Sequence, residues 1–387
     1  MGERGGLTRR EVLRRCFYGG LGVLGLEALT IAGCRRAPVG PWPNILLITL
    51  DTTRRDRLGC YGHGRPTSPN LDRLAADSLL YTRAFAPSNW TLPSHASLFT
   101  GKFTSSHGAR FDPEGPLSLV GLEGSPEFWS RFRARGLAPG ETTLAMMLRE
   151  EGYATGGVGA GPWMKRAFGL DRGFDFWDDD HIGTANGRPA STVTPAALKW
   201  IEEKGEERFF LFLNYFDPHF PYSPPLEFAR RFLPAGTDPA KLDIYKPSLE
   251  ERSALYDAEI LFMDHHLGLL LEEMKRLGLY DNTWIIVTSD HGEMLGEHGL
   301  LGHGKKLHQE EIHIPLLMKY PEGEAAAGTV DADIQLTDIM PMVLRRLGLT
   351  VPPGMQGGVP PKSGHPTIAE YYPLEFLGPD GDTRAII

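Results

Sequence analysis

Cysteine is scarce in this chain, which contains only three among 387 residues. Two of them, Cys16 and Cys34, lie in an N-terminal segment with the features of an export signal, so only Cys60 is left for the rest of the chain. A single thiol forms neither a disulfide framework nor a thiolate metal centre. The sequence therefore excludes a fold that depends on disulfides or on cysteine ligands.

An excess of basic residues is also missing. The chain has 40 Lys and Arg against 49 Asp and Glu, which gives a formal net charge of -9. Proteins that bind nucleic acid need a basic face to neutralise phosphates, so we expect no nucleic-acid partner. The hydrophobic content of 41% and the charged content of 23% are typical of a folded, enzyme-sized protein.

The sequence has no long, uninterrupted apolar run. The best candidate, residues 17–32, contains several glycines and Glu27, so it is a poor permanent membrane span. Arg9 and Arg10 precede it, which is typical of a twin-arginine export signal. The segment ends in "IAGC", which resembles a bacterial lipobox with Cys34 as the lipidated residue.

We therefore expect residues 1–33 to be a signal and residues 34–43, rich in Pro and Gly, to be a tether. This predicts a periplasmic or cell-surface lipoprotein that contacts the membrane only through a lipid on Cys34. The alternative is an uncleaved, weakly anchored N-terminus. Both interpretations predict export.

Three short apolar runs follow, at residues 44–50, 208–216 and 283–289, and they resemble strands buried on both faces. Residues 257–277 have apolar side chains at helical spacing, as the crossover of a parallel sheet requires. Alternating strands and helices predict an α/β fold, a doubly wound, mostly parallel or mixed sheet flanked by helices.

Two further segments have less regular patterns. Residues 108–142 are rich in Gly, Pro and Arg, and we expect a surface excursion that serves as a lid or specificity loop. Within it, "SRFRAR" offers Arg131, Arg133 and Arg135 as an anion site, although such a run is more often a solvated face.

Acidic residues and imidazoles follow all three predicted strands. Asp51 follows the first, Asp217 and His219 follow the second, and Asp290 and His291 follow the third. One such Asp is commonly a turn residue or a helix cap. Ligands of open α/β sheets bind beyond the carboxyl ends of the strands, so three together indicate a functional site.

We expect Asp51, Asp290 and His291 to hold one divalent cation, with Thr91 as the fourth ligand. Thr91 lies in "NWTLPSHASLFTG", just before Pro93, whose fixed φ suits a first helical turn. A helix N-terminus there would direct N–H groups at an anion, and a metal would lower the pKa of the Thr hydroxyl. The alternative is that Thr91 is an ordinary N-cap.

The chain resembles the sulfatase family of the alkaline phosphatase superfamily from about residue 44 to residue 349. The resemblance is carried by "NILLITLDTTRRD", "TSPNLDRLA", "TLPSHASLFTG", "YDAEILFMDHHLG", "TSDHGEMLGEHG" and "EEIHIPLLMKYP". It implies a catalytic domain over residues 44–349 that cleaves sulfate esters with a divalent metal, by default calcium. It also implies a smaller C-terminal subdomain, of which residues 350–387 would be a short and incomplete version.

The nucleophile slot departs from the family pattern C/S-x-P-S-R, because this chain has Thr91 and His95 at its ends. Threonine cannot be oxidised to formylglycine, so the attacking group would be the unmodified hydroxyl, as in the superfamily's phosphodiesterases and phosphotransferases. His95 replaces the supporting Arg and would donate a hydrogen bond to the nucleophile.

The metal and anion ligands depart from the family as well. The pairs Asp51-Thr52 and Asp290-His291 lose a carboxylate and gain an imidazole, which favours manganese or zinc over calcium. The family's Gly-Lys-Trp-His segment reads "GGVGAGPWM" here and lacks its Lys and His. His303 takes the place of a later family Lys.

The resemblance assigns roles to further residues. His219 matches the family's His that faces the departing oxygen, so we expect a general acid or leaving-group stabiliser, with Asp217 orienting it or binding a second metal. His303 can also donate this proton, and Lys305, two residues further on, is a candidate anion contact. Arg54 is either an anion contact or the partner of Asp56 in a surface ion pair.

Together these features predict an exported, metal-dependent hydrolase of sulfate esters, acting on a small-molecule or glycan sulfate or phosphate ester. Three alternatives stay open: a phosphodiesterase or phosphonate monoester hydrolase that uses Thr91, a phosphotransferase, and a catalytically inactive lipoprotein that binds anions or glycans. The residue at position 91 favours the phosphorus esters, whereas the family favours the sulfate esters.

Overall fold

The computed structural model describes residues 42–119, 132–180, 182, 186–360, 363–372 and 383–386 of the unit formed by Pro38–Ile387. The expected signal, the tether up to residue 41 and Arg131 lie outside the described residues. Among the residues that are described, no helix has the length and apolar character needed to cross a membrane.

The core of the fold is an eight-stranded sheet with the order β13-β2-β12-β9-β1-β8-β6-β7. Strand β1 pairs in parallel with β8 and β9, and only β12 runs antiparallel to its neighbours β9 and β2. The predicted mixed, mostly parallel sheet is confirmed. The strands of this sheet are β1 (Asn44–Leu50), β2 (Leu79–Phe85), β6 (Ala154–Val158), β7 (Phe176–Asp178), β8 (Phe209–Tyr215), β9 (Thr283–Thr288), β12 (His313–Lys319) and β13 (Gly328–Gln335).

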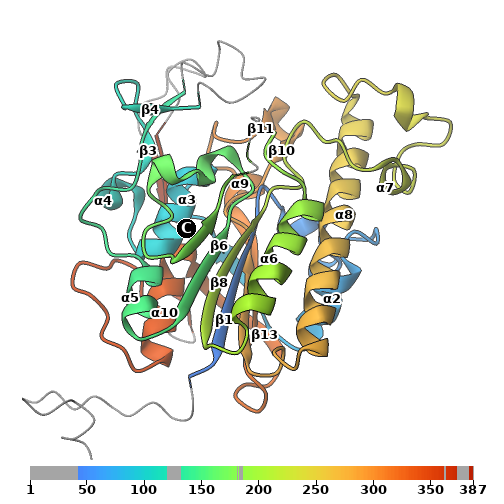
Figure 1. The fold of residues 1–387 in the computed structure, drawn as a ribbon. Helices are drawn as coiled ribbons and strands as arrows, with labels where there is room; N and C mark the ends of the chain where they lie inside the picture. Colours follow the sequence, from blue (N-terminus) through green and yellow to red (C-terminus); the bar gives the residue numbers. More distant parts are fainter. Residues whose placement is uncertain are drawn as a thin grey trace, which may run out of the picture. The chain divides into compact units, whose positions relative to one another are not determined.

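Helices cover both faces of this sheet (Figure 1). They are α2 (Pro69–Ala76), α3 (Thr91–Thr100), α4 (Thr104–His107), α5 (Leu144–Glu150), α6 (Ala190–Lys204), α7 (Leu226–Ala229), α8 (Leu249–Arg276), α9 (Gln309–Ile312) and α10 (Ile339–Arg346). Strand β1 shows why two layers are needed, because its successive side chains point to opposite faces. Ile45 and Leu47 pack in the core with α3, α5 and α10, and Leu46 and Ile48 pack in the core with α6 and α8.

Helix α8 is longer than the sequence periodicity predicts, since it begins at Leu249 rather than near residue 257. Its start is fixed by a capping box in which the Ser248 hydroxyl accepts from the Glu251 N–H and the Glu251 carboxylate accepts from the Ser248 N–H. The first turns of α8 carry charged residues, so the apolar pattern alone places the start too late.

Three small sheets lie outside the main one. They are β3 (Arg110–Phe111) with β5 (Arg133–Arg135) and β4 (Leu117–Ser118), β10 (Met294–Leu295) with β11 (Leu301–Gly302), and β14 (Ile368–Tyr371) with β15 (Thr383–Ile386). The first shows that part of the 108–142 segment is regular. Arg133 donates to the Gly115 carbonyl and Arg135 pairs with Asp112, so these two side chains are engaged within the segment itself.

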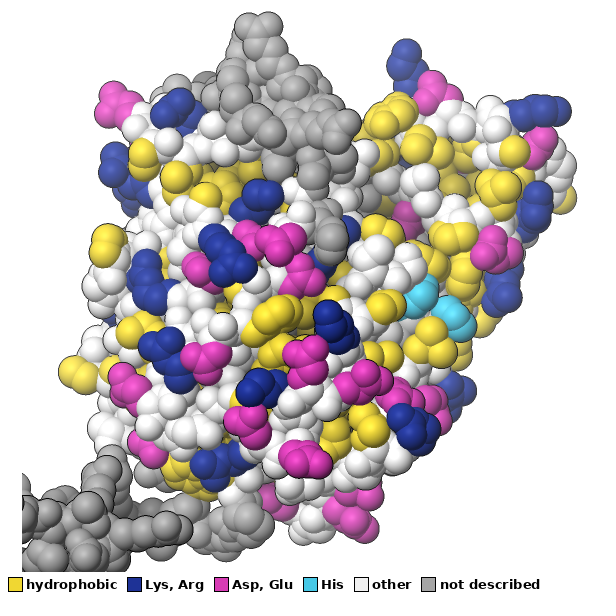
Figure 2. Space-filling model, viewed as in Figure 1, with side chains coloured by type: hydrophobic (Ala, Val, Ile, Leu, Met, Phe, Trp, Pro, Cys, Tyr) yellow, Lys and Arg dark blue, Asp and Glu magenta, His cyan; other side chains and the backbone are white. Residues whose placement is uncertain are grey.

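The surface shown in Figure 2 mixes Lys and Arg with Asp and Glu and with scattered apolar side chains. No large field of one sign develops on this face. Its imidazoles gather over α8, where His265 is exposed and His266 is half-buried. Neither histidine lies in the cluster of ionisable residues at the strand ends.

Candidate active site

The parallel strands β9, β1 and β8 are neighbours, so their carboxyl ends meet at one edge of the sheet. There the structure brings together Asp51, Asp290 and His291, each fully buried, with one ligand atom of each within 4.8 Å of the others. The sequence predicted that these residues would meet but could not give the distances between them. The predicted convergence of two carboxylates and one imidazole is present.

Thr91 is the first residue of α3 and faces the same cluster. The preceding residue, Trp90, occupies the N-cap position, so Thr91 is not the ordinary N-cap that the sequence left open as an alternative. Instead the Thr91 Oγ1 lies 3.4 Å from the His291 Nε2. A hydroxyl and three ionisable side chains from distant parts of the chain therefore surround one small volume.

The spacing of these atoms suits a small cation. The His291 Nε2 lies 3.3 Å from the Asp290 Oδ2 and 4.0 Å from the Asp51 Oδ1. Ligand bonds of about 2.1 Å in a tetrahedral site put neighbouring donor atoms about 3.4 Å apart. The Asp51 Oδ1 and the Asp290 Oδ2 are buried and have no hydrogen-bond partner among the described residues. Unpaired buried carboxylate oxygens are costly, and a bound cation would remove that cost.

The pKa shifts in the cluster also fit a site for a divalent cation. Burial, reinforced by the charge of Asp290, raises the pKa of Asp51 well above its ordinary value. Burial also raises the pKa of Asp290 to about 7, and burial together with the charge of His303 lowers the pKa of His291. Without a nearby positive charge, the two buried carboxyl groups resist ionisation and the imidazole stays neutral. A divalent cation would favour the carboxylate form of both acids and bind the neutral imidazole.

Backbone contacts fix the ligand orientations. The His291 Nδ1 lies 2.9 Å from the Gly292 carbonyl oxygen, to which it donates, so the neutral ring presents the Nε2 lone pair to the cluster. The Asp290 Oδ1 accepts from the backbone N–H groups of His291 and Thr52. Thr52 has a φ of 55°, which is unusual for a β-branched residue, and its hydroxyl donates to the Pro218 carbonyl at 2.7 Å. This strained turn ties the end of β1 to Asp290 and to the segment after β8.

A pair of residues beside the cluster includes one that sequence reasoning missed. The His303 Nδ1 lies 3.1 Å from the Glu293 Oε2, and the His303 ring centroid lies 4.5 Å from that of His291. Burial opposes protonation, but the charge of Glu293 raises the pKa of His303 above its ordinary value. Glu293 is completely buried, and a Glu two residues after His291 gives no local signal for this long-range pairing.

His219 is present at the site, but Asp217 does not orient it as predicted. The His219 Nδ1 lies 2.7 Å from the Phe220 carbonyl oxygen, and its ring stacks on Phe216. The Asp217 Oδ2 accepts from the Ala190 N–H at the start of α6, because a helix N-terminus offers unpaired donors to a carboxylate. Burial, with a smaller effect of His303, lowers the pKa of His219 to about 3, so its Nε2 is an acceptor at neutral pH.

His95 also differs from the expectation. Its Nδ1 donates to the backbone carbonyl of Thr91 at 2.8 Å, and its Nε2 lies 2.8 Å from the Thr49 hydroxyl. The ring lies one helical turn after Thr91, so it reaches the carbonyl rather than the attacking hydroxyl. His95 therefore holds the first turn of α3 against β1, and it makes no direct hydrogen bond to the Thr91 Oγ1 in the described structure.

The two predicted anion contacts lie in different surroundings. Arg54 is buried, and its guanidinium is engaged by the carboxylates of Asp56 and Glu297. This agrees with the ion-pair alternative, in which the Arg54 side chain is buried and the Asp56 side chain is exposed. Lys305 lines the cavity next to the site and donates to the Leu301 carbonyl at 2.7 Å.

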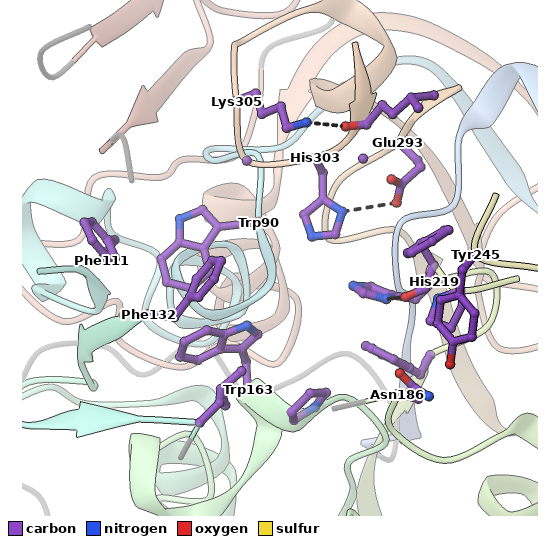
Figure 3. Close-up of a pocket in the computed structure, with 18 of the residues that line it drawn as sticks. Trp90, Phe111, Phe132, Trp163, Asn186, His219, Tyr245, Glu293, His303 and Lys305 are labelled. Atoms are coloured by element: carbon purple, nitrogen blue, oxygen red, sulfur yellow. Dashed lines mark hydrogen bonds and ion pairs between the residues drawn. The ribbon is translucent and has the colours of Figure 1, made fainter. Parts of the chain in front are cut away.

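A cavity of about 670 Å³ lies beside this cluster, on the side of Trp90 and His303, and is lined by His219, Glu293 and His303. Figure 3 shows an aromatic side opposite these polar groups, formed by Trp90, Phe111, Phe132 and Trp163. The ring of Trp90 packs edge-on against Trp163 with centroids 5.1 Å apart. The sequence gave no sign of this wall, because its members come from three separate segments.

The fold and the site define an α/β protein with a hydroxyl that faces a candidate metal centre at the carboxyl edge of a mixed sheet. A profile described as "Sulfatase" matches residues 43–349. The chain therefore belongs to the sulfatase family of the alkaline phosphatase superfamily, as its motifs predicted.

Individual relatives agree with this assignment. The chain is 27% identical to the ulvan-active sulfatase of Formosa agariphila over 347 residues, which are 81% of this chain and 63% of that protein. A protein solved in complex with its substrate D-glucosamine-2-N,6-O-disulfate superposes with a TM-score of 0.68 at 19% identity, covering 86% of this chain and 84% of the other. The phosphonate monoester hydrolase of Agrobacterium radiobacter superposes with a TM-score of 0.67 at 24% identity, covering 85% and 80%.

Proposed function

We propose that this chain is a metal-dependent hydrolase that cleaves a sulfate ester by attack of the unmodified Thr91 hydroxyl. The observation that carries the proposal is the position of the Thr91 Oγ1 beside Asp51, Asp290 and His291, which together leave unpaired donor atoms in a buried volume. The imidazole ligand favours manganese or zinc. When bound, such an ion would lower the pKa of the hydroxyl and stabilise charge on the transferred group.

The reaction would proceed in two displacements. In the first, the Thr91 oxygen forms a bond to sulfur, its proton leaves, and the bond from sulfur to the ester oxygen breaks. The departing oxygen takes up one proton, so the products are the Thr91 sulfate ester and a free alcohol. In the second, water attacks the same sulfur and returns a proton to Thr91, which releases inorganic sulfate.

His303 is the better proton donor of the two candidate histidines. Its Nδ1 is held by Glu293, which leaves the opposite nitrogen, Nε2, to carry a proton toward the cavity. His219 donates its Nδ1 proton to a backbone carbonyl, so its neutral ring has an acceptor at Nε2. We therefore assign His303 as general acid and His219 as a group that positions the ester by accepting a hydrogen bond.

The charges around the cavity favour a transferable group with one negative charge. Two carboxylates would balance a divalent cation, and the negative charge of Glu293 favours protonation of His303. Among the described residues lining the cavity, Arg252 and Lys305 are the only Lys or Arg side chains, and Arg252 packs over the ring of Phe220. A sulfate ester or a phosphonate monoester carries one charge, whereas a phosphate monoester carries two and would need a further cation.

The aromatic wall indicates the organic part of the substrate. Trp90 and Trp163 offer flat apolar surfaces opposite His303 (Figure 3). Such surfaces stack on aromatic rings or on the apolar face of a sugar ring. We propose a ring-shaped small molecule or a terminal sugar rather than a long, highly charged chain.

The test compares hydrolysis of nitrophenyl sulfate, a nitrophenyl phosphonate monoester, a nitrophenyl phosphodiester and nitrophenyl phosphate by the metal-loaded protein. We expect turnover of the sulfate and little turnover of the dianionic phosphate. Thr91→Ala should abolish turnover, and Thr91→Ser should retain part of it. Unchanged turnover in Thr91→Ala would exclude the proposed nucleophile.

A phosphonate monoester or phosphodiester hydrolase is the second candidate. It is favoured by the hydroxyl nucleophile, because Thr91 cannot supply the aldehyde expected of a formylglycine sulfatase. A phosphonate monoester hydrolase also shares the fold. If the phosphorus esters are turned over faster than nitrophenyl sulfate, this candidate replaces the first.

We also propose that the protein is exported and lipidated on Cys34. The support is the sequence alone, with Arg9 and Arg10 ahead of a short apolar segment that ends in "IAGC". Labelling of cells with a fatty-acid analogue should mark the wild-type protein, and the label should be lost in Cys34→Ser. A wild-type protein without label would remove the lipid anchor from the proposal.

A further inference from the structure

A second group of ligand-type side chains lies outside the cluster that contains Thr91. His298, His308 and Glu310 each place one ligand atom within 4.8 Å of the others. The His298 and His308 rings stack with centroids 4.0 Å apart, and the His298 Nε2 lies 3.4 Å from the Glu310 Oε1. His298 is exposed, and the other two side chains are half-buried, so the group is accessible from solvent.

The dimensions of this group fit a metal ion. Zinc binds imidazole nitrogen at about 2.0–2.1 Å and carboxylate oxygen at about 2.0–2.2 Å, so the edge of a tetrahedral site is roughly 3.4 Å long. The separation between His298 and Glu310 already has this length. The remaining adjustment in donor separation is below about 1.5 Å. Because the stacked rings lie only 7° from parallel, the exposed His298 ring must also turn out of the stack to point its lone pair at the same ion.

The backbone prepares this arrangement at a cost. His298 has a φ of 55°, in the left-handed region that non-glycine residues seldom adopt. Such a conformation is unfavourable and persists only where the surroundings impose it. On the other side, the Glu310 carbonyl accepts from the Glu293 N–H at 3.1 Å, which fixes the start of α9 against the segment after His291.

We propose that His298, His308 and Glu310 bind a zinc ion that clamps the two ends of one loop. The loop between His298 and His308 carries His303 and Lys305, both of which line the cavity. Two imidazoles and one carboxylate are zinc ligands in proteins, and this set is a poor match for calcium or magnesium, which prefer oxygen. The fourth position would be open to water.

The proposed zinc ion would restrict the movement of the loop and would not contact the reacting atoms. The two histidines lie ten positions apart in the sequence, so an ion that holds both would restrict how far His303 can move from Glu293 and from the cavity. Without an ion, the same contacts amount to an exposed His298–Glu310 ion pair and a ring stack, and exposed ion pairs contribute little.

The test measures bound zinc in the full-length protein. The protein is stripped with a chelator, dialysed against zinc chloride, and its zinc content is determined by elemental analysis. We expect two zinc equivalents per wild-type chain and one in His298→Ala/His308→Ala. The matched control is His265→Ala/His266→Ala, because these two histidines on α8 are also in ring contact, with centroids 5.3 Å apart; it should keep two equivalents.

Two additional measurements make the result decisive. Glu310→Gln preserves size and removes only the carboxylate charge, and it should weaken zinc binding at the clamp at least tenfold. Asp290→Asn impairs the other cluster and should leave one zinc equivalent, held at the clamp. Circular dichroism checks that each variant is folded. Equal zinc content in the wild type and the His298→Ala/His308→Ala variant would overturn the proposal, as would an Asp290→Asn variant that binds none.

Discussion

Glu293→Gln tests the assignment of His303 as the proton donor. The substitution keeps the size of the side chain and an oxygen that can accept from the His303 Nδ1 at about the same 3.1 Å. It removes the negative charge that raises the pKa of His303. A hydrogen bond to a charged group contributes about 1.5–3 kcal/mol and a neutral one about 0.5–1.5 kcal/mol. The difference, roughly 1–1.5 kcal/mol, corresponds to a fall of about one pKa unit.

The assay compares two esters of the same acid with different leaving groups. An alkyl ester leaves as a strongly basic alkoxide and needs a proton, whereas 4-nitrophenolate departs without one. We expect kcat for the alkyl ester to fall about tenfold at a pH above the pKa of His303 and by less near neutral pH, while kcat for the nitrophenyl ester stays within about twofold. Because the acid form of His303 is lost at a lower pH in the variant, the alkaline limb of the alkyl-ester profile should move down by about one unit.

The matched control is Glu311→Gln. The charge of Glu311 also raises the pKa of His303, but by less than the charge of Glu293, so this substitution should move the alkaline limb in the same direction and by less. A Glu293→Gln variant that loses both substrates equally would assign Glu293 to the structure of the site instead. A variant with the wild-type rate on the alkyl ester would show that His303 is not the donor.

Three other predictions concern the metal, the cavity and the stability of the fold. Removal of metal with a chelator should abolish ester hydrolysis, and manganese or zinc should restore it in the wild type but not in Asp51→Asn, as followed by product release. Trp163→Ala should raise KM for aryl esters about tenfold with less effect on kcat, because it removes one aromatic surface of the cavity; an unchanged KM would move the binding surface elsewhere. Glu259→Gln should stabilise the protein above pH 7. Burial raises the pKa of both Asp217 and Glu259, so their contribution to stability falls as pH rises from about 4, the unfolded pKa, through the folded values. The two side chains are hydrogen-bonded to each other, and Gln mimics the protonated form of Glu259. The difference in stability between pH 5 and pH 8, measured by denaturant unfolding, should therefore be smaller than in the wild type.

The strands and the ligands at their ends could be predicted from the sequence because both signals are local. The run at residues 44–50 is apolar throughout, as a strand buried on both faces must be, and it forms β1 over the same residues. Asp51 directly follows β1 and Asp290 comes two residues after the end of β9, so the parallel pairing of these strands places the two carboxylates side by side. Because the strands are parallel, residues that follow different strands in the sequence meet at the same edge of the sheet.

The contacts that the sequence could not give are those decided by competition between distant partners. The sequence suggested that Asp217 orients His219 or binds a second metal. In the structure, its carboxylate accepts a hydrogen bond from the Ala190 N–H at the start of α6. Glu293 had no visible partner, because His303 reaches it only after the β10–β11 hairpin folds back. Trp90 and Trp163 face each other although more than seventy residues separate them. Neither hydrophobic periodicity nor motif spacing in the sequence predicts any of these contacts.

The segment from Asp290 to Glu310 contains the candidate metal ligand Asp290, the pair formed by Glu293 and His303, and the proposed zinc clamp. Its contacts give a physical reason for a histidine at position 303. The family resemblance places a lysine there, which would carry its charge without help. A buried imidazole tends to be neutral, and the lowered pKa of His291 nearby shows how strong that tendency is at this site. Glu293 reverses it for His303, and the proposed clamp at His298 and His308 would hold the loop that keeps the pair together. Under the proposed function, the exchange of lysine for histidine would turn a fixed charge into a transferable proton, and only while the loop holds His303 against Glu293.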